Sequence, residues 1–319
     1  MSLPTALSDA PPVLFLMGPT ATGKTALAVE LARRLPCDII SVDSAQVYRG
    51  MDIGTAKPGP DILGIVPHRL IDILDPAQAY SAGRFCLDAA HEIRAIRRAG
   101  RIPLLVGGTM LYFHALQFGL AELPAADPAT RARIEGQARE HGWGALHRRL
   151  EQVDPRAAHR IHPNDPQRIQ RALEVHALTG TPLTELQARR VVPILGLPVV
   201  KVALAPSDRG ALHQIIDARF HAMLRGGFTD EVEQLRRRGD LDLNRPALRA
   251  VGYRQVWEYL EGRLTHAEMT CRAVVATRQL AKRQLTWLRG QDDAVVVDSL
   301  SADRLDKLLN ALRERKILG

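Results

Sequence analysis

An octapeptide near the N-terminus places the strongest constraint on what this chain can fold into. Residues 18–25 read Gly-Pro-Thr-Ala-Thr-Gly-Lys-Thr, which matches the phosphate-binding pattern G-x-x-x-x-G-K-[ST]. The apolar run 13–17 precedes the motif and the helical run 26–32 follows it, as a strand–loop–helix unit requires. Loop N–H groups and the positive end of the helix create an anion site, to which Lys24 adds a cation. The Thr25 hydroxyl is placed to ligate Mg²⁺, so the motif predicts bound phosphate rather than an empty Gly-rich turn.

Length and composition limit the classes of protein to consider. A chain of 319 residues with 46% hydrophobic residues forms one large domain with an insertion, or two domains. A formal net charge of +8 suggests a polyanionic partner. The three cysteines form no C-x-x-C pair, and His159 and His162 lack a neighbouring acidic or cysteine cluster, so we expect no disulfide framework and no zinc site. Residues 1–10 indicate a flexible leader without signal-peptide order, and no run is long enough to span a membrane, so we expect a cytoplasmic protein.

Short apolar runs alternate with amphipathic helical patterns along most of the chain. This alternation predicts an α/β fold, a P-loop NTPase-like parallel sheet covered by helices on both faces. The segment 121–196 is too long for one crossover and is broken repeatedly by proline, so we expect a helical insertion domain there. The core then comprises 11–120 and 197–319. The expected strands are 13–17, 38–42, 69–73, 102–106, 198–204 and 294–297, and the expected C-terminal helices are 208–225, 229–238, 246–260 and 265–289.

Two strand ends carry the chemistry expected beside the phosphate loop. Ligands of open parallel sheets bind beyond the carboxyl ends of the strands, where Asp43 follows the second strand. Its carboxylate could bind Mg²⁺, act as a general base, or simply cap a helix. The polar segment 52–58 is expected to form a loop near the same rim. The strand 102–106 ends in Gly107-Gly108-Thr109, where many P-loop NTPases carry an acidic Walker-B residue, and this weakens an ATPase interpretation.

Two helical segments carry patterns that suit a nucleic acid. Gln167, Arg168 and Arg171 share one surface of the helix expected around 167–175, and amide and guanidinium groups recognise bases and phosphates. Arg278, Lys282 and Arg289, with Thr286 beside them, form a stripe on the helix 265–289, and Trp287 lies across from it. Such a stripe can follow a nucleic-acid backbone, although each pattern alone is also compatible with a solvated helix face.

Six ordered blocks of sequence resemble bacterial tRNA dimethylallyltransferases. They are G-P-T-A-T-G-K-T (18–25), D-S-A-Q-V-Y-R-G-M-D-I-G-T-A-K-P (43–58), V-G-G-T-x-L-Y (106–112), Q-R-I-Q-R-A-L-E-V (167–175), R-A-V-G-Y-R-Q (249–255) and K-R-Q-L-T-W-L-R (282–289). The phosphate loop alone is shared by many families, whereas six blocks in series over nearly the whole chain are highly specific.

The resemblance implies transfer of a dimethylallyl group from dimethylallyl diphosphate to N6 of an adenosine. That adenosine would lie immediately 3′ of the anticodon in tRNAs reading codons that begin with U, and it would be flipped out of its stack. Pyrophosphate would leave with the assistance of Mg²⁺ bound at Thr25. The resemblance also accounts for the missing Walker-B acid, because the loop would hold the diphosphate of an isoprenoid donor and hydrolyse no nucleoside triphosphate. The implied catalytic residues are Asp43, Thr109, Lys24 and Arg219, and the implied diphosphate-binding residues are Gly18, Pro19, Thr20, Ala21, Thr22, Gly23, Lys24 and Thr25.

The same resemblance implies contacts with the tRNA anticodon stem-loop. The implied contact residues are Asp43, Ser44, Ala45, Gln46, Thr109, Gln167, Arg168, Ile169, Gln170, Arg171, Arg249, Gly252, Tyr253, Arg254, Lys282, Arg283, Gln284, Thr286, Trp287 and Arg289. We expect a monomer without an obligate protein partner. Three alternatives remain open at this point: prenylation of free adenine nucleotides, a small-molecule P-loop kinase, and an RNA-binding module without enzymatic activity.

Overall fold

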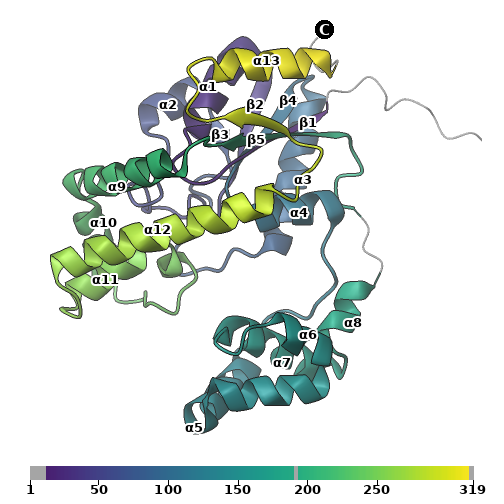
Figure 1. Cartoon of the computed structure of the whole chain (residues 1–319), viewed down its shortest axis with the longest axis vertical. Coiled ribbons are helices and arrows are strands. Elements are labelled where there is room, and N and C mark those ends of the chain that lie inside the picture. The colour runs from purple at the N-terminus through teal and green to yellow at the C-terminus, as the bar shows by residue number, and fades with distance from the viewer. Residues whose placement is uncertain (1–11, 190–192, 316–319) are drawn as a thin grey trace, which may run out of the picture. The chain divides into compact units, whose positions relative to one another are not determined.

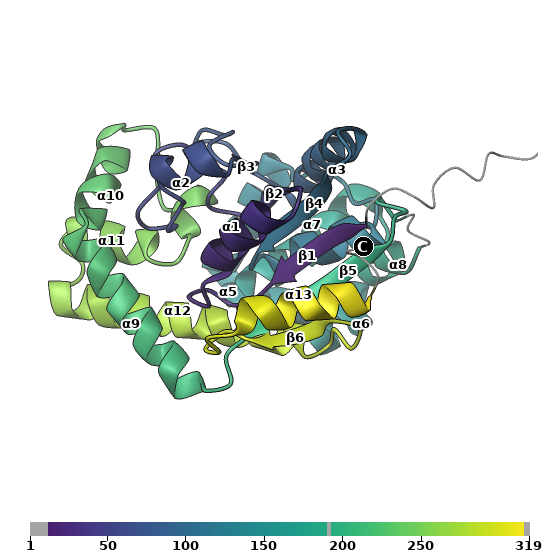
Figure 2. The same cartoon turned by 90° about the horizontal axis from the view of Figure 1, so that it is seen from above.

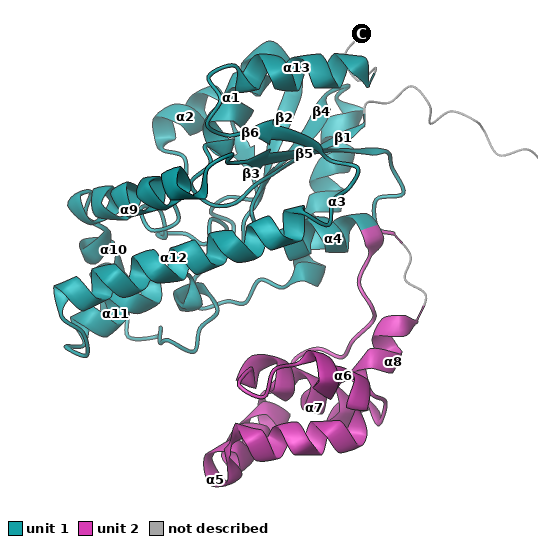
Figure 3. Cartoon of the chain, in the orientation of Figure 1, with its two compact units in different colours: residues 1–117, 194–319 teal, residues 118–193 magenta. Residues whose placement is uncertain are grey.

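The computed structural model describes residues 12–189 and 193–315, and it divides into two compact units (Figures 1 and 3). Unit 1 consists of residues 1–117 and 194–319, and unit 2 of residues 118–193. The helical insertion was predicted at 121–196. The predicted leader, 1–10, lies outside the described residues.

A parallel sheet organises unit 1. Its strands are β1 (Val13–Met17), β2 (Cys37–Val42), β3 (His68–Arg69), β4 (Ile102–Gly107), β5 (Val199–Ala205) and β6 (Val295–Asp298). They lie in the order β3-β2-β4-β1-β5-β6, and every described strand pair is parallel. The prediction of a parallel α/β sheet is therefore confirmed. Because β1 lies centrally between β4 and β5, the loop that follows it opens at the middle of the carboxyl edge.

The third strand is shorter than its sequence suggests. The predicted strand 69–73 is wrong beyond Arg69, because Leu70 and Asp72 adopt left-handed backbone conformations with φ of 63° and 56°. An extended ladder cannot continue through such residues. The chain turns instead, and Leu74 then forms an isolated parallel bridge with Tyr48.

Helices cover both faces of the sheet, as the alternating side chains of its strands dictate. Leu14 and Leu16 of β1 belong to a buried cluster with α1 (Lys24–Arg34) and α13 (Arg304–Glu314), and Figure 2 shows these two helices along the same face. Phe15 points the other way and packs against Phe113, their ring centroids 4.9 Å apart. Phe113 lies on α4 (Met110–Phe118). The helix α3 (Ala82–Arg98) packs against β2 and β4. The short helix α2 (Pro60–Ile65) precedes β3.

Four helices follow β5 and build the wall facing the carboxyl edge of the sheet. They are α9 (Arg209–Arg225), α10 (Phe228–Arg237), α11 (Tyr253–Leu260) and α12 (His266–Leu288), and α12 packs against both α9 and α11 (Figure 1). The single helix predicted at 246–260 is wrong. A 3₁₀ turn covers Ala247–Arg249, and the helix is then interrupted. The next helix, α11, begins after Gly252, whose φ of 94° lies in the region that favours glycine.

Unit 2 is a small helical domain with its own core. It contains α5 (Pro128–Val153), α6 (Pro155–Arg160), α7 (Pro166–Thr179) and α8 (Leu183–Ala188). The prolines of this segment start helices, since α5, α6 and α7 each carry proline in the first turn and an aspartate N-cap. Ile134, Leu150, Ile169 and Leu173 meet in the core. Among the described residues of both units, no helix combines the length and hydrophobicity needed to cross a membrane.

Candidate active site

The phosphate loop connects β1 to α1 in the geometry that its sequence predicts. The N–H of Gly18 donates to the carbonyl of Gly107 on the neighbouring strand at 3.3 Å. A Cβ atom at Gly18 would lie 2.6 Å from the carbonyl oxygen of Leu204, so only glycine fits between these strands. Gly23, with φ of 76°, caps α1 and turns the chain into the helix. The loop is therefore fixed by the sheet on one side and by the helix N-terminus on the other.

Lys24 is held inside the loop by backbone oxygen. Its Nζ donates to the carbonyl of Pro19 at 2.6 Å, and the Thr22 hydroxyl donates to the same carbonyl at 2.8 Å. The pKa of Lys24 is lowered to about 7, chiefly by burial and to a smaller extent by the nearby Arg219 guanidinium, while the Asp43 carboxylate opposes the shift. Burial also lowers the pKa of Arg219, again opposed by Asp43. Two half-buried cations therefore share one carboxylate, an environment that favours a bound anion.

Asp43 and Thr109 meet where β2 and β4 end. Oδ1 of Asp43 accepts hydrogen bonds from the N–H groups of Ala45 at 2.8 Å and Gln46 at 3.3 Å, which orients the carboxylate. The Thr109 hydroxyl accepts from the N–H of Ser44 at 3.1 Å, and its own proton remains available for donation. Asp43 caps no α-helix among the described elements, so the helix-capping alternative is not observed. The structure thus brings a carboxylate and a hydroxyl to the rim beside Lys24.

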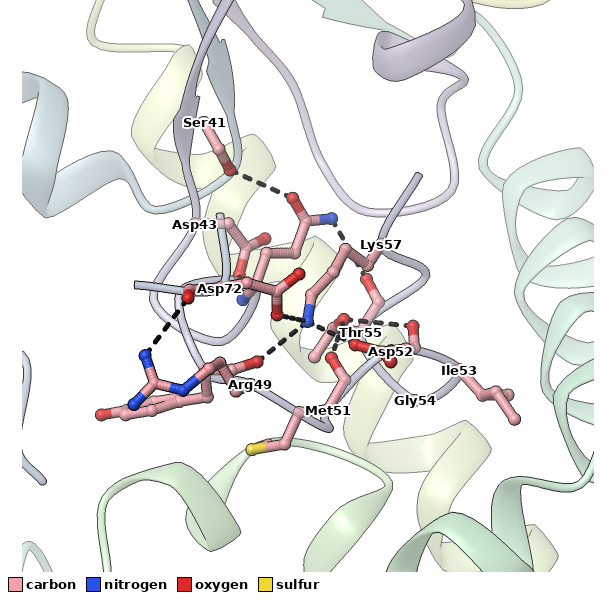
Figure 4. Close-up of polar contacts among 12 residues, drawn as sticks. Ser41, Asp43, Arg49, Met51, Asp52, Ile53, Gly54, Thr55, Lys57 and Asp72 are labelled. Carbon is pink, nitrogen blue, oxygen red and sulfur yellow. Dashed lines mark hydrogen bonds and ion pairs between the residues drawn. The ribbon is translucent and has the colours of Figure 1, made fainter. Parts of the chain in front are cut away.

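The segment 43–57 folds back on itself around the side chains of Gln46 and Lys57 (Figure 4). The Gln46 amide donates to the carbonyls of Thr55 and Ala56 at 3.3 and 3.4 Å, and its oxygen accepts from the Ser41 hydroxyl at 3.0 Å. The Lys57 side chain is only 3% exposed. Its ammonium donates to the carbonyl of Tyr48 at 2.8 Å and pairs with the carboxylates of Asp52 and Asp72. This segment is therefore a rigid wall rather than an open loop.

A cavity of about 790 Å³ joins these elements within unit 1. Its polar part is formed by Lys24, Thr25, Asp43, Thr109 and Arg219. The same cavity also has an apolar lining, which comes mainly from α9, α10 and α12. The apolar residues are Ile216, Phe220, Met223, Phe228, Leu280 and Trp287.

Arg219 on α9 was predicted from the sequence, but the apolar residues of the same helix that line the cavity were missed. Ile216, Arg219, Phe220 and Met223 recur at the i, i+3, i+4, i+7 spacing of one helix face. That spacing was visible in the sequence, but it does not distinguish a face that lines a cavity from one that packs into a core. The structure shows that this face borders the site, with Arg219 among the apolar residues.

Gln284 connects α12 to the phosphate loop. Its side-chain oxygen accepts from the N–H of Thr20 at 2.9 Å, and its amide nitrogen donates to the carbonyl of Gly108 at 2.8 Å. A Cβ atom at Gly108 would lie 2.4 Å from that nitrogen and 3.2 Å from the carbonyl oxygen of Gly18, so a side chain here would displace the Gln284 amide from this contact. Gln284 was predicted to contact tRNA. In this structure it is buried and both ends of its amide bond to the protein.

The other residues predicted to contact RNA in unit 1 divide by exposure. Trp287 lines the cavity and meets His114 edge to face, away from the stripe, while Arg278 lines a separate hollow beside Asp217. Tyr253 and Gly252 are buried, and the Tyr253 hydroxyl donates to Glu231. Ala45 and Gln46 are half-buried. The exposed residues are Ser44, Arg249, Arg254, Lys282, Arg283, Thr286 and Arg289.

In unit 2 the predicted RNA contacts occupy one helix, α7, but differ in their availability. Gln167 and Arg168 are exposed. Ile169 is buried in the core, so its side chain does not reach the surface. Gln170 donates to Glu135 at 2.8 Å, and Arg171 pairs with the fully buried Glu174 at 2.9 Å. Glu174, which also pairs with Arg131, organises the unit and was not singled out from sequence.

The fold and the site together define a P-loop enzyme whose cavity is lined by cationic, carboxylate and apolar side chains. Comparison with known proteins gives the family. A sequence model described as IPP transferase matches residues 46–291, and one described as isopentenyl transferase matches residues 11–67. The chain belongs to the IPP transferase family.

Individual relatives extend this match over nearly the whole chain. The tRNA dimethylallyltransferase of Thioalkalivibrio sulfidiphilus is 59% identical over 96% of this chain and 94% of the relative. That of Alkalilimnicola ehrlichii is 64% identical over 88% of each chain. The crystal structure of the tRNA isopentenylpyrophosphate transferase of Bacillus halodurans is 37% identical, covers 96% of each chain and gives a TM-score of 0.68. A eukaryotic dimethylallyltransferase captured acting on tRNA is 25% identical, covers 94% of this chain and 77% of the other, and gives a TM-score of 0.76.

Proposed function

We propose that this protein transfers a dimethylallyl group from dimethylallyl diphosphate to N6 of the adenosine immediately 3′ of the anticodon. The substrates are tRNAs that read codons beginning with U, and the products are N6-dimethylallyladenosine in tRNA and pyrophosphate. One observation carries the proposal: a single cavity combines a phosphate loop, a carboxylate and an apolar wall. The relatives named tRNA dimethylallyltransferase support the tRNA acceptor.

The diphosphate of the donor suits the cationic residues that line the cavity, and its dimethylallyl group suits the apolar ones. Lys24, Arg219 and the loop N–H groups form a cationic end for the diphosphate. Ile216, Phe220 and Met223 offer apolar surface for the dimethylallyl group, whose burial is favourable. A nucleoside triphosphate would place a polar ribose against these side chains, and the strand end at Gly107-Gly108-Thr109 offers no Walker-B carboxylate. This combination favours an isoprenoid donor over a kinase substrate.

The adenine acceptor reacts beside the Asp43 carboxylate. N6 of adenine attacks the allylic carbon, the carbon–oxygen bond breaks, and pyrophosphate leaves with the electron pair. Asp43 accepts the N6 proton through the carboxylate that Ala45 and Gln46 orient. Thr109 donates a hydrogen bond to the diphosphate or holds N6, while Lys24 and Arg219 balance the charge that develops on the leaving group. Alignment in the cavity supplies much of the rate, because an exocyclic amine is a poor nucleophile.

The oxygen ligands present fit Mg²⁺. The Thr25 hydroxyl and the Asp43 carboxylate border the same cavity, and Thr25 makes no side-chain hydrogen bond to any described residue. Within the described ranges no group of three His, Cys, Asp or Glu side chains could hold a metal by itself. Mg²⁺ normally takes one or two protein ligands and completes its shell with substrate phosphate and water. We therefore propose that Thr25 holds Mg²⁺ with the donor, where the ion would neutralise diphosphate charge.

The basic stripe of α12 provides a test of the tRNA surface. We expect the double substitution Lys282→Ala and Arg289→Ala to weaken tRNA binding by about tenfold at moderate salt and to reduce the salt dependence of log Kd, because fewer counterions are released. Filter binding at several salt concentrations measures both quantities. Arg34→Ala on α1, which removes an exposed cation whose partner Asp306 is also exposed, is the control. Unchanged affinity in the double variant would show that the stripe is only a solvated face.

One labelling experiment tests the function as a whole. The protein is incubated with labelled dimethylallyl diphosphate, Mg²⁺ and either unmodified tRNA, AMP or ATP. We expect label in tRNA, at the adenosine 3′ of the anticodon, from the monomeric protein without added partners. Label in AMP or ATP alone would instead support prenylation of free adenine nucleotides, and no transfer to any acceptor would overturn the proposal. A tRNA acceptor also agrees with the expected cytoplasmic location.

A further inference from the structure

Glu231, on the first turn of α10, makes an unusual set of contacts for a side chain outside the cavity. Its carboxylate accepts four hydrogen bonds. The N–H groups of Asp52 and Ile53 donate to Oε2 at 2.9 and 2.6 Å, and the N–H of Gly54 donates to Oε1 at 3.1 Å. The Tyr253 hydroxyl donates to Oε1 at 2.5 Å. One carboxylate therefore satisfies three consecutive backbone donors and a phenol, from two segments far apart in sequence.

The surroundings of Glu231 reinforce this arrangement. Burial and the neighbouring carboxylate raise the pKa of Tyr253, so its hydroxyl remains a donor at every physiological pH. The first turn of a helix is also where a carboxylate is stabilised by the helix dipole. A Cβ atom at Gly54 would lie 2.1 Å from the Phe228 ring and 2.5 Å from the Tyr253 ring, so the segment is pressed against α10 and α11.

The segment that Glu231 holds reaches the reacting carboxylate through two further contacts. Gly54, Thr55 and Ala56 line the cavity, and the carbonyls of Thr55 and Ala56 accept from the Gln46 amide. The Gln46 backbone N–H in turn donates to Oδ1 of Asp43. Figure 4 shows the Asp52–Thr55 segment beside Asp43. Movement of the segment would therefore release Gln46 and disturb the orientation of Asp43.

We propose that Glu231 is a positioning residue of the transferase. It fixes the cavity wall 52–56 against α10 and α11 and, through Gln46, sets the carboxylate of Asp43 for proton transfer. This inference rests on the proposed function. It differs from an overall stabilising role because Lys57 also anchors this segment, through Asp52, Asp72 and the Tyr48 carbonyl, and would keep the segment folded without Glu231.

The test compares Glu231→Gln with Glu233→Gln, a matched control two residues away whose ion pairs with described residues are those with Arg236 and Arg237. A glutamine at 231 turns an amide N–H₂ toward backbone donors, and a displacement of about 1 Å at a reacting group costs on the order of a hundredfold in rate. We expect Glu231→Gln to lower kcat for tRNA by about tenfold to a hundredfold. We expect pyrophosphate affinity to stay within about twofold of wild type, because the phosphate loop is untouched. Tyr253→Phe, which removes one of four donors, should lower kcat by a smaller factor.

Amide hydrogen exchange identifies the cause of the effect. Glu231→Gln should speed exchange at residues 52–54 and leave β1, β4 and the phosphate loop as protected as in wild type. A kcat within about twofold of wild type, a loss of kcat with unchanged exchange at 52–54, or faster exchange throughout unit 1 would each overturn the positioning role. If wild-type protein fails to prenylate tRNA, it is the proposed function that fails, and the exchange result alone then decides whether Glu231 holds the segment.

Discussion

Replacing Asp43 by asparagine is expected to lower kcat for tRNA prenylation by about 10²- to 10⁴-fold, the usual contribution of a general base. The amide oxygen can still accept from the N–H groups of Ala45 and Gln46, so the local turn is retained. What is lost is the ability to accept the N6 proton. Single-turnover measurement with tRNA and labelled dimethylallyl diphosphate separates this step from product release.

Binding measurements distinguish this loss from a loss of substrate. We expect tRNA affinity in Asp43→Asn within a few fold of wild type, with pyrophosphate affinity unchanged or increased, since a negative charge beside Lys24 is removed. Asp38→Asn, at the opposite end of β2, is the matched control. It removes partners of Arg69 and Arg101 and should lower the melting temperature with little effect on kcat. Near-normal turnover in Asp43→Asn with both substrates bound would contradict the general-base assignment.

The sequence predicted the sheet and the rim of the site because both depend on local chemistry. The strand–loop–helix order around residues 18–25 determines where phosphate binds, and parallel strands carry their carboxyl ends to one edge. Asp43 and Thr109 therefore had to approach the loop, and the Ser44–Thr109 hydrogen bond shows that their segments meet.

The wall of the cavity could not be predicted in the same way. Phe220 and Met223 follow an ordinary amphipathic pattern, and only the packing of α9 against α12 reveals that this face borders the site. Glu231 belongs to a charged helix turn in which nothing in the sequence marks one glutamate over Glu233. Its partners include backbone N–H groups, which every residue except proline carries, so the residue types at 52–54 do not reveal the contact.

Two errors have a common physical origin. The predicted strand 69–73 and the predicted helix 246–260 were both drawn through residues whose backbone turns to positive φ, namely Leu70, Asp72 and Gly252. Gly252 could have signalled a break, because glycine alone adopts that conformation freely. Asp72 gave a weaker signal, since Asp tolerates this conformation better than most residues, and Leu70 gave none. The Asp72 carboxylate pairs with the buried Lys57, a contact between residues far apart in the chain.

Replacing Lys24 by methionine is expected to lower kcat by about 10²- to 10³-fold, comparable to the loss of one donor that stabilises developing charge. The variant keeps the length of the side chain but removes the ammonium that would face the departing pyrophosphate. Weaker binding of dimethylallyl diphosphate should accompany the loss, because the ammonium also contacts the diphosphate of the bound donor before the reaction. Pre-steady-state turnover at saturating donor isolates the effect on chemistry, and turnover within a few fold of wild type would remove Lys24 from the mechanism.

The pKa of Lys24 adds a signature that other cations of the site would not give. In the free protein this pKa lies at about 7, so the ammonium is largely formed below pH 7 and largely neutral above it. Bound diphosphate favours the charged form and raises the pKa, so binding above pH 7 must take up a proton. Pyrophosphate affinity should therefore fall as pH rises from 7 to 9 more steeply in wild type than in Lys24→Met.

Calorimetric titration in two buffers of different ionisation enthalpy measures this proton uptake directly. The titration of pyrophosphate itself contributes equally to both proteins and cancels in the comparison. We expect wild type at pH 8 to take up nearly one proton more than Lys24→Met, and the excess to disappear below pH 6, where Lys24 is already charged before binding. Equal uptake by the two proteins at pH 8 would mean that Lys24 is charged in the free loop. Its hydrogen bond to Pro19 would then outweigh the cost of burial.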